Sequence, residues 1–240
     1  MKSVAIISAL TLASAALPAV SQDLYRPGST LAAQVSPAKP DVFGTVALPV
    51  ARSRYDARWR RVASFDGAAV PAALRPAALR SGNAQAQAQA VNATLNRQVR
   101  YRFDAPRDHW ATARETMASL AGDCEDIAIA KMQALLALGV PASDLFMSIG
   151  SDTAAGAVHA VLLVRLQDRF WVLDNRTDRL IEPEAFGQFH PILTFSGERT
   201  WLHGYRLGTM PAEVRALSIA ANTGRLQVGG AGSSPAQGQS

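Results

Sequence analysis

The only cysteine of this 240-residue chain, Cys124, is flanked by acidic residues and followed by an apolar run. Because Asp123 before it is a good N-cap, the pattern places Cys124 in the first turn of a helix. There the unpaired backbone N–H groups and the helix dipole stabilise a thiolate, which prepares a nucleophile. A single cysteine forms no internal disulfide, so the fold does not depend on oxidation. We therefore interpret Cys124 as a catalytic nucleophile.

Two strand-like runs downstream supply the partners that a cysteine nucleophile needs. His159 interrupts the apolar run 156–164, and Asp174 ends the run 170–174. A two-residue turn at 166–167 would place the two side chains directly opposite each other, and one at 167–168 would place them diagonally on the same face. A three-residue loop would send them to opposite faces. We predict that Asp174 orients the imidazole of His159, which acts as the base.

Each of these two residues also has a purely structural interpretation. A histidine in an apolar run is more often a core residue with satisfied hydrogen bonds than a catalyst, and Asp174 could simply begin a turn. The spacing of His159 and Asp174 on adjacent runs is what favours catalysis.

The carboxylates around Cys124 oppose its activation, because nearby negative charge raises the pKa of a thiol. Either these groups point away from the sulfur, or a cation neutralises them. Ca²⁺ is the cation with oxygen ligands that is expected outside the cytoplasm, and Asp123 and Glu125 are the best candidate ligands. The alternative is that Asp123 only caps the helix and Glu125 is a solvated acid of the first turn.

The elements that must position these residues form a helix followed by an antiparallel sheet. A helix is predicted over 122–138 and ends at Gly139. Strands are expected at 145–149, 157–166, 169–174 and 192–195. An earlier helix over 84–96 presents Asn92 and Asn96 on one face. The predicted fold class is α+β.

The two ends of the chain do not have the pattern of this fold. Residues 1–21 combine a positive start, a short apolar segment and small residues of the kind that a signal peptidase reads, so we predict export to the periplasm. An N-terminal membrane anchor is the alternative. The expected organisation is a signal peptide at 1–21, a flexible segment at 22–42, one domain at 43–210 and a tail at 211–240. The loop-like composition of the flexible segment continues to about Pro49. The tail is expected to be largely disordered from about residue 228.

Charge alone does not indicate a nucleic-acid partner. The net charge is +5 and the isoelectric point is about 9.9. The basic residues are mostly scattered arginines, except for a group over 52–61 that alternates with Tyr55 and Trp59. No recognition motif accompanies them, so we interpret this group as a solvated helix face.

Other candidate residues carry weaker signals. His109, His190 and His203 have no carboxylate at a matching spacing and are expected to be surface or packing residues. Trp110 could donate its indole N–H to an oxyanion, but core packing is the expected role. Metal-binding Cys/His sets and phosphate-binding glycine patterns are absent from the sequence.

A run of motifs resembles one known family. The motifs are Tyr101-x-x-Asp104, the block from His109 to Thr116, the block from Gly122 to Lys131, Val158–Leu162 and Val172–Asn175. They look like bacterial transglutaminase-like cysteine peptidases, whose best-described members are LapG-type periplasmic proteases. The resemblance covers about half of the chain, roughly residues 90 to 205. It implies a papain/transglutaminase-like core with Cys124 as nucleophile, His159 as base and Asp174 as orienting acid.

The same resemblance implies a calcium-dependent cysteine endopeptidase of the periplasm that acts in biofilm control. It implies Ca²⁺ held by Asp123 and Glu125, a protein substrate that is a large cell-surface adhesin, and an inner-membrane receptor controlled by cyclic di-GMP. We expect no nucleic-acid partner and no stable membrane insertion once the signal is removed. Two alternatives stay open, namely acyl transfer to an amine and a binding or regulatory module without turnover.

Overall fold

The computed structural model describes residues 38–66, 83–103 and 109–215, which all belong to one compact unit. The predicted signal peptide and the predicted disordered tail lie outside the described residues. In the described ranges, no helix is both long enough and apolar enough to cross a membrane.

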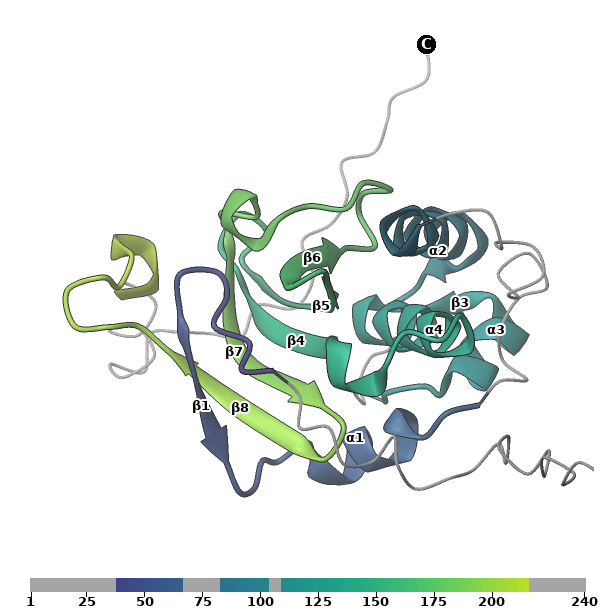
Figure 1. Cartoon of the computed structure of the whole chain (residues 1–240), viewed down its shortest axis with the longest axis horizontal. Coiled ribbons are helices and arrows are strands. Elements are labelled where there is room, and N and C mark those ends of the chain that lie inside the picture. Colours follow the sequence, from purple (N-terminus) through teal and green to yellow (C-terminus); the bar gives the residue numbers. More distant parts are fainter. Residues whose placement is uncertain (1–37, 67–82, 104–108, 216–240) are drawn as a thin grey trace, which may run out of the picture. The chain divides into compact units, whose positions relative to one another are not determined.

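The centre of the fold is an antiparallel sheet of six strands in the order β1-β8-β7-β4-β5-β6 (Figure 1). Its strands are β1 (Val46–Val50), β4 (Leu145–Asp152), β5 (Ala157–Leu166), β6 (Arg169–Leu173), β7 (Phe189–Ser196) and β8 (Arg199–Gly204). Two further short strands, β2 (Arg100–Tyr101) and β3 (Ala121–Gly122), pair in parallel. β4 and β5 lie in the middle of the large sheet and are mostly buried, which accounts for their nearly continuous apolar sequences.

In the described part of the chain, four helices accompany the sheet, and Figure 1 shows α2, α3 and α4 grouped on one side of it. They are α1 (Asp56–Ala63), α2 (Ala84–Gln98), α3 (Ala113–Ser119) and α4 (Cys124–Ala137), with short 3₁₀ turns η4 (Ala142–Asp144) and η5 (Pro183–Ala185). α4 is buried on nearly all sides and packs against β5, α2 and α3. The predicted α+β fold class and the predicted helix that begins at the cysteine are therefore confirmed.

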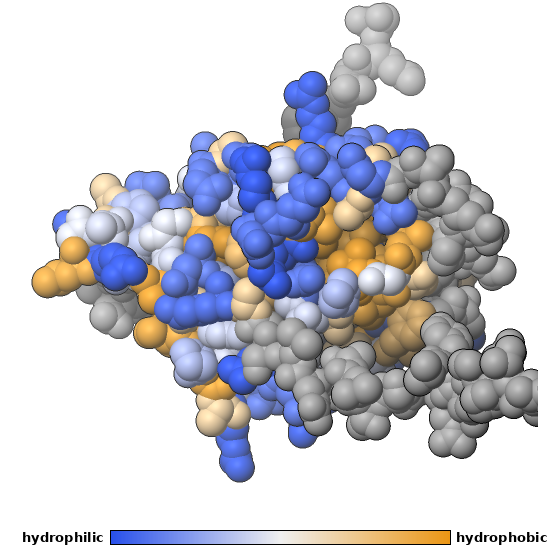
Figure 2. All heavy atoms as spheres, viewed as in Figure 1, coloured by the Kyte–Doolittle hydropathy of each residue, from blue (hydrophilic) through white to orange (hydrophobic). Residues whose placement is uncertain are grey.

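The sheet separates two apolar clusters. One lies between the sheet and the helices, and it includes Ile127 and Leu135 of α4. The other lies on the opposite face and is rich in aromatic rings, with Phe43 and Phe189 in edge-on contact. At the surface, Figure 2 shows hydrophobic residues in patches among hydrophilic ones.

The hairpin that joins β5 to β6 has a two-residue turn at Gln167 and Asp168. Both residues have positive φ, 51° and 62°, as in the primed turns that suit the twist of a hairpin. Leu166 consequently pairs with Arg169, and this register places Asp174 diagonally from His159 on the same face. This is the second of the two registers that the sequence allowed for a histidine–aspartate pair.

One prediction about the N-terminal part is wrong. The sequence up to about Pro49 was expected to be loop, but residues 46–50 form β1, the edge strand beside β8. Pro49 is compatible with this position, because an edge strand has backbone groups that need no ladder partner. The pairing joins residues about 150 positions apart, since Val46 lies opposite Gly204, so no local pattern reveals it.

Candidate active site

The first turn of α4 is built around Asp126 as well as Asp123. Asp123 occupies the N-cap position, and its backbone N–H donates to Asp126 Oδ2 over 3.3 Å. The other oxygen of Asp126 accepts the N–H of Ala111 over 2.6 Å. A Cβ on Gly122 would lie 2.6 Å from Asp126 Cβ, so only glycine fits there. Asp126 therefore points away from the sulfur and anchors the segment before α3 to the helix that carries Cys124.

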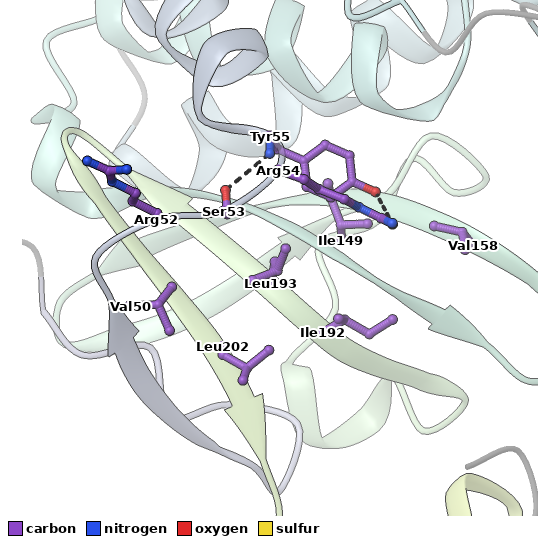
Figure 3. Close-up of a pocket in the computed structure, with 10 residues that line it drawn as sticks. All are labelled: Val50, Arg52, Ser53, Arg54, Tyr55, Ile149, Val158, Ile192, Leu193 and Leu202. Carbon is purple, nitrogen blue, oxygen red and sulfur yellow. Dashed lines mark hydrogen bonds between the residues drawn. The ribbon is translucent and has the colours of Figure 1, made fainter. Parts of the chain in front are cut away.

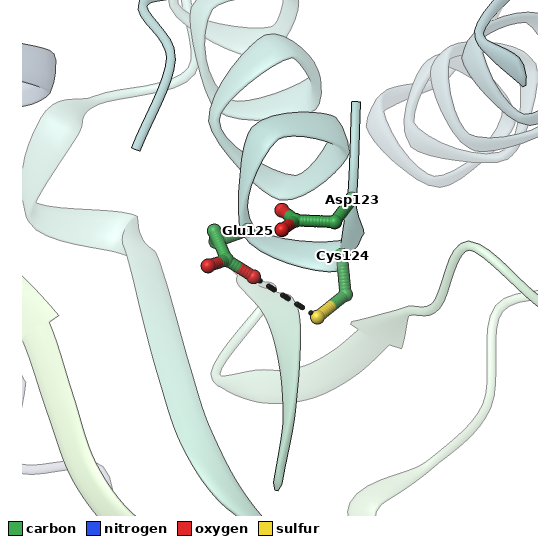
Figure 4. Close-up of side chains that lie close together, drawn as sticks. All are labelled: Asp123, Cys124 and Glu125. Atoms are coloured by element: carbon green, nitrogen blue, oxygen red, sulfur yellow. Dashed lines mark hydrogen bonds between the residues drawn. The ribbon is translucent and has the colours of Figure 1, made fainter. Parts of the chain in front are cut away.

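Cys124 lies in the first turn of α4, buried, with its sulfur between an acid and a strand. The thiol donates to Glu125 Oε2 over 3.1 Å (Figure 4), and Ala160 of β5 lies nearby. Burial raises the pKa of the thiol, and the charge of Glu125 raises it further. The sequence indicated two opposite effects on the thiol, from the helix start and from the carboxylates. In the structure, burial and the carboxylates outweigh the helix start, and the protonated thiol is favoured.

His159 and Asp174 form a buried pair. His159 Nε2 lies 2.8 Å from Asp174 Oδ1, and their side chains are 9% and 3% exposed. The predicted contact between these two residues is confirmed. Burial raises the pKa of Asp174, but the hydrogen bond and charge of His159, together with Arg176, lower it to about 2. Because an ionised carboxylate only accepts, Nε2 donates a hydrogen bond to Asp174, and Nδ1 is the ring nitrogen that can accept a proton.

Arg176 ties the carboxylate of Asp174 to a second buried acid. Its Nε donates to Asp174 Oδ2 over 3.0 Å, and its Nη1 donates to Asp152 Oδ2 over 2.6 Å. The other oxygen of Asp152 accepts the N–H groups of Ala154 and Ala155 in the β4–β5 turn. Arg176 was not singled out from the sequence. Its only local signal is a basic residue two positions after the predicted acid.

The loop after Asp174 is held by two side chains of α2. Asn96 donates to the carbonyl oxygens of Asp174 and Thr177, and Asn92 also donates to that of Thr177. The predicted shared face of Asn92 and Asn96 is confirmed, and its role is to fix the backbone that carries Asp174.

Three potential ligand atoms gather at the start of α4. One from each of Asp123, Cys124 and Glu125 lies within 4.8 Å of the others, and Figure 4 shows the two carboxylates turned toward each other near the sulfur. Burial, followed by the charges of these residues, raises the pKa of the nearby Tyr101 to about 12. Carboxylate oxygens are ligands that Ca²⁺ accepts, whereas a thiol is too soft a donor for it. The acids thus fit a calcium site that leaves the sulfur free for chemistry.

The remaining candidates have structural roles, as expected. Trp110 is buried and stacks on Tyr55 with ring centroids 5.3 Å apart. His203 bonds to two threonine hydroxyls, and burial lowers its pKa to about 4. His190 bonds to a tyrosine hydroxyl, and His109 is largely exposed.

Lys131 is a buried charge that the sequence did not flag. It lies on α4 two turns after Cys124, it is fully buried, and its Nζ has no hydrogen-bond partner among the described residues. Burial lowers the pKa of this amine to about 7, against the opposing charges of Asp174 and Asp178. The amine thus adds positive charge in the neighbourhood of the catalytic pair when it is protonated.

This buried amine predicts a specific pH dependence of stability. Between about pH 7 and 10 the unfolded chain binds more protons than the folded one at Lys131, so this group makes stability rise with pH by up to about 1.4 kcal/mol per unit. Lys131→Met removes that contribution. In urea titrations from pH 7 to 9, the free energy of unfolding of the wild type minus that of Lys131→Met should increase. A difference that stays constant would mean that the amine is solvated.

One comparison with known proteins defines the family. Residues 69–186, which include Cys124, His159 and Asp174, match the family described as bacterial transglutaminase-like cysteine proteinases (BTLCP). The chain belongs to this family. It is therefore a cysteine protease, with the fold class and the type of reaction of this family. No curated protein matches the chain.

Solved structures of LapG from Legionella pneumophila are similar to this cysteine proteinase. The EGTA-treated form is 25% identical with a TM-score of 0.49, over 59% of this chain and 81% of LapG. The calcium-bound form is also 25% identical, with a TM-score of 0.48, over 62% of this chain and 83% of LapG.

Proposed function

We propose that this protein is a calcium-dependent cysteine endopeptidase of the periplasm that cuts a large cell-surface adhesin, with Cys124, His159 and Asp174 as its catalytic residues. One observation carries the catalytic part. Cys124 begins the helix that packs against β5, and His159 of that strand is bonded to Asp174. The start of α4 thus carries the nucleophile, and the strand packed against α4 carries the base, which is bonded to its orienting acid.

This arrangement suits acyl transfer through a thioester. Nδ1 of His159 takes the proton of Cys124 as the sulfur attacks the peptide carbonyl carbon, and His159⁺ then gives that proton to the leaving amine. The first-turn N–H groups of α4 have no partner within the helix and can stabilise the oxyanion. Asp174 stays ionised and holds the imidazole in the required tautomer. Water then hydrolyses the thioester.

The calcium part of the proposal rests on the charge around the thiol. Burial and the charge of Glu125 raise the pKa of Cys124, and the carboxylate of Asp123 adds to the negative charge. A divalent cation on Asp123 and Glu125 would supply the positive charge that favours the thiolate. The same cation would compete with the sulfur for the carboxylate of Glu125.

Calcium should raise the melting temperature of the wild type, because it binds the folded state, by an amount set by the ratio of free calcium to its dissociation constant. Magnesium should substitute poorly, since it demands octahedral geometry and keeps its water. Thermal shifts are compared in EGTA, calcium and magnesium for the wild type, Asp123→Ala and Glu125→Ala. Glu184→Ala, an acid of η5, is the matched control and should respond like the wild type. If all four proteins melt identically under every condition, the acids only cap the helix.

The location and the substrate come from the first 21 residues and from the family resemblance of the motifs. A short apolar segment after Lys2, followed by small residues, favours export, and the LapG-type members of the family release adhesins under a cyclic-di-GMP receptor. Cell fractionation should find a shortened chain, without residues 1–21, in the periplasm.

The substrate is sought by comparing cells that carry wild-type protein with cells that carry Cys124→Ala. New N-termini on released surface proteins, labelled and sequenced, should identify one large protein cut near its N-terminus only in the wild-type cells. Purified protein with calcium should reproduce that cut on washed Cys124→Ala cells. A product that carries an added amine in place of a free carboxylate would instead favour acyl transfer. Identical N-termini in both strains would contradict the adhesin proposal.

A further inference from the structure

An apolar groove of about 310 Å³ is lined by strands of the large sheet and by the segment before α1 (Figure 3). Its floor consists of Val50, Ile149, Val158, Ile192, Leu193 and Leu202, and its rim consists of Arg52, Ser53, Arg54 and Tyr55. Val158, Ile192 and Leu202 are 68%, 45% and 43% exposed. Large apolar side chains exposed together in a hollow indicate a binding surface.

The floor of this groove leads directly away from the nucleophile. Ala160, which follows His159 on β5 and lies near Cys124, is opposite Ile149 in the sheet. Ile149 lies opposite Leu193, and Leu193 lies opposite Leu202. This row crosses β5, β4, β7 and β8. With strands about 4.8 Å apart, it spans about 14 Å, or about four residues of an extended chain.

The rim of the groove carries two positively charged side chains. Arg52 and Arg54 are exposed, and neither forms an ion pair with a described residue. Arg54 donates to the hydroxyl of Tyr55 over 2.7 Å, and its guanidinium lies 4.8 Å from the centre of that ring. Figure 3 shows this pair between Ile149 and Val158. Tyr55 is itself fixed by its stacking on Trp110. One guanidinium is thus held near the strand that carries His159.

We propose that this groove binds the substrate polypeptide beside the scissile bond, and that it selects an extended segment of about four residues in which large apolar side chains are combined with acidic ones. The inference rests on the proposed endopeptidase function, whose substrate class it narrows. Apolar side chains would pack on Ile149, Leu193 and Leu202, while a carboxylate would pair with Arg54 or Arg52. The occupant is a protein chain that leads to the active site, because Val158 of the floor precedes His159 and Ile149 of the floor lies opposite Ala160.

The experiment uses a random dodecapeptide library and the full chain with Cys124→Ala, which binds without cutting. Captured peptides are sequenced by mass spectrometry. They should be enriched in large apolar residues, with acidic residues preferred over basic ones by about tenfold. The double change Arg52→Glu and Arg54→Glu, made in the same inactive chain, should reverse the charge preference and keep the apolar one. Arg60→Glu, an exposed arginine of α1 outside the groove, is the matched control and should change neither preference.

The outcomes separate this inference from the proposed function. No enrichment, or a charge preference that the double change leaves intact, would overturn the groove proposal. Captured peptides are then offered to the wild type with calcium. If the protein binds apolar, acidic peptides in preference to others but cuts none of them, the groove proposal is supported and the endopeptidase proposal fails. If peptides are cut equally well whatever their charge and apolar content, the endopeptidase stands and the groove proposal fails.

Discussion

Replacing Cys124 by alanine should lower the rate of substrate cleavage by about 10⁴-fold or more, because the covalent thioester route is lost entirely. The fold should remain, with the free energy of unfolding within about 1 kcal/mol of the wild type. The sulfur is buried, but among the described residues its one short side-chain hydrogen bond is to Glu125. Cleavage of the mapped substrate and a urea titration check both parts.

A suitable comparison is Cys124→Ser, which keeps a hydroxyl at the same place in the first turn of α4. A serine hydroxyl is a much weaker nucleophile than a thiolate, so this variant should also be nearly inactive. If either variant retained more than about a tenth of the activity, the nucleophile would have to be another residue.

His159→Ala should cost a similar factor of about 10⁴, and adding Asp174→Ala to it should cost nothing more. The reason is that Asp174 acts on the reaction only through the imidazole, to which it is bonded over 2.8 Å. The single change Asp174→Ala should be slow as well, because the base then loses its tautomer and orientation. Initial rates of the two single variants and the double variant are compared under saturating calcium.

Replacing Asp174 by alanine should affect the stability of the fold separately from the rate of cleavage. Its carboxylate also pairs with Arg176, which in turn pairs with Asp152. Asp174→Ala should therefore destabilise the fold by about 3 kcal/mol, as expected when one partner of a buried charge pair is removed. Unfolding measurements on the same variants separate this structural cost from the catalytic one. Rate losses that multiply in the double variant would show that Asp174 has a catalytic role apart from His159.

Local sequence patterns were sufficient to predict where Cys124, His159 and Asp174 lie. A good N-cap and an apolar run fix the start of α4, so the place of Cys124 follows from residues within one turn. The spacing of His159 and Asp174 left two registers in which they meet. The choice between them depends on a turn of two residues with positive φ, which no strong signal such as Asn-Gly marks.

Contacts between distant segments could not be read in the same way. The edge strand β1 is paired with β8, far along the chain, and its short sequence contains a proline. Arg176 and Asp152 form an ion pair, and the loop that carries Arg176 reaches Asp152 only because the strands of the sheet are arranged as they are. Lys131 sits in an apolar helical run like any solvated lysine, and only the packing of α4 shows that it is buried. Residues joined by long-range contacts were therefore missed, while the helix start at Cys124 and the His159–Asp174 pair were predicted.

The central claim, that Cys124 forms a thioester with the substrate, is tested most directly by trapping that intermediate. Wild-type protein with calcium is mixed with a peptide that spans the mapped cleavage site, quenched in acid within milliseconds, and digested for mass spectrometry. The peptide that contains Cys124 should carry the acyl half of the substrate, and hydroxylamine should remove it. The adduct should be absent from His159→Ala. Rapid cleavage by the wild type without an adduct on Cys124, or with an adduct on another residue, would contradict the account.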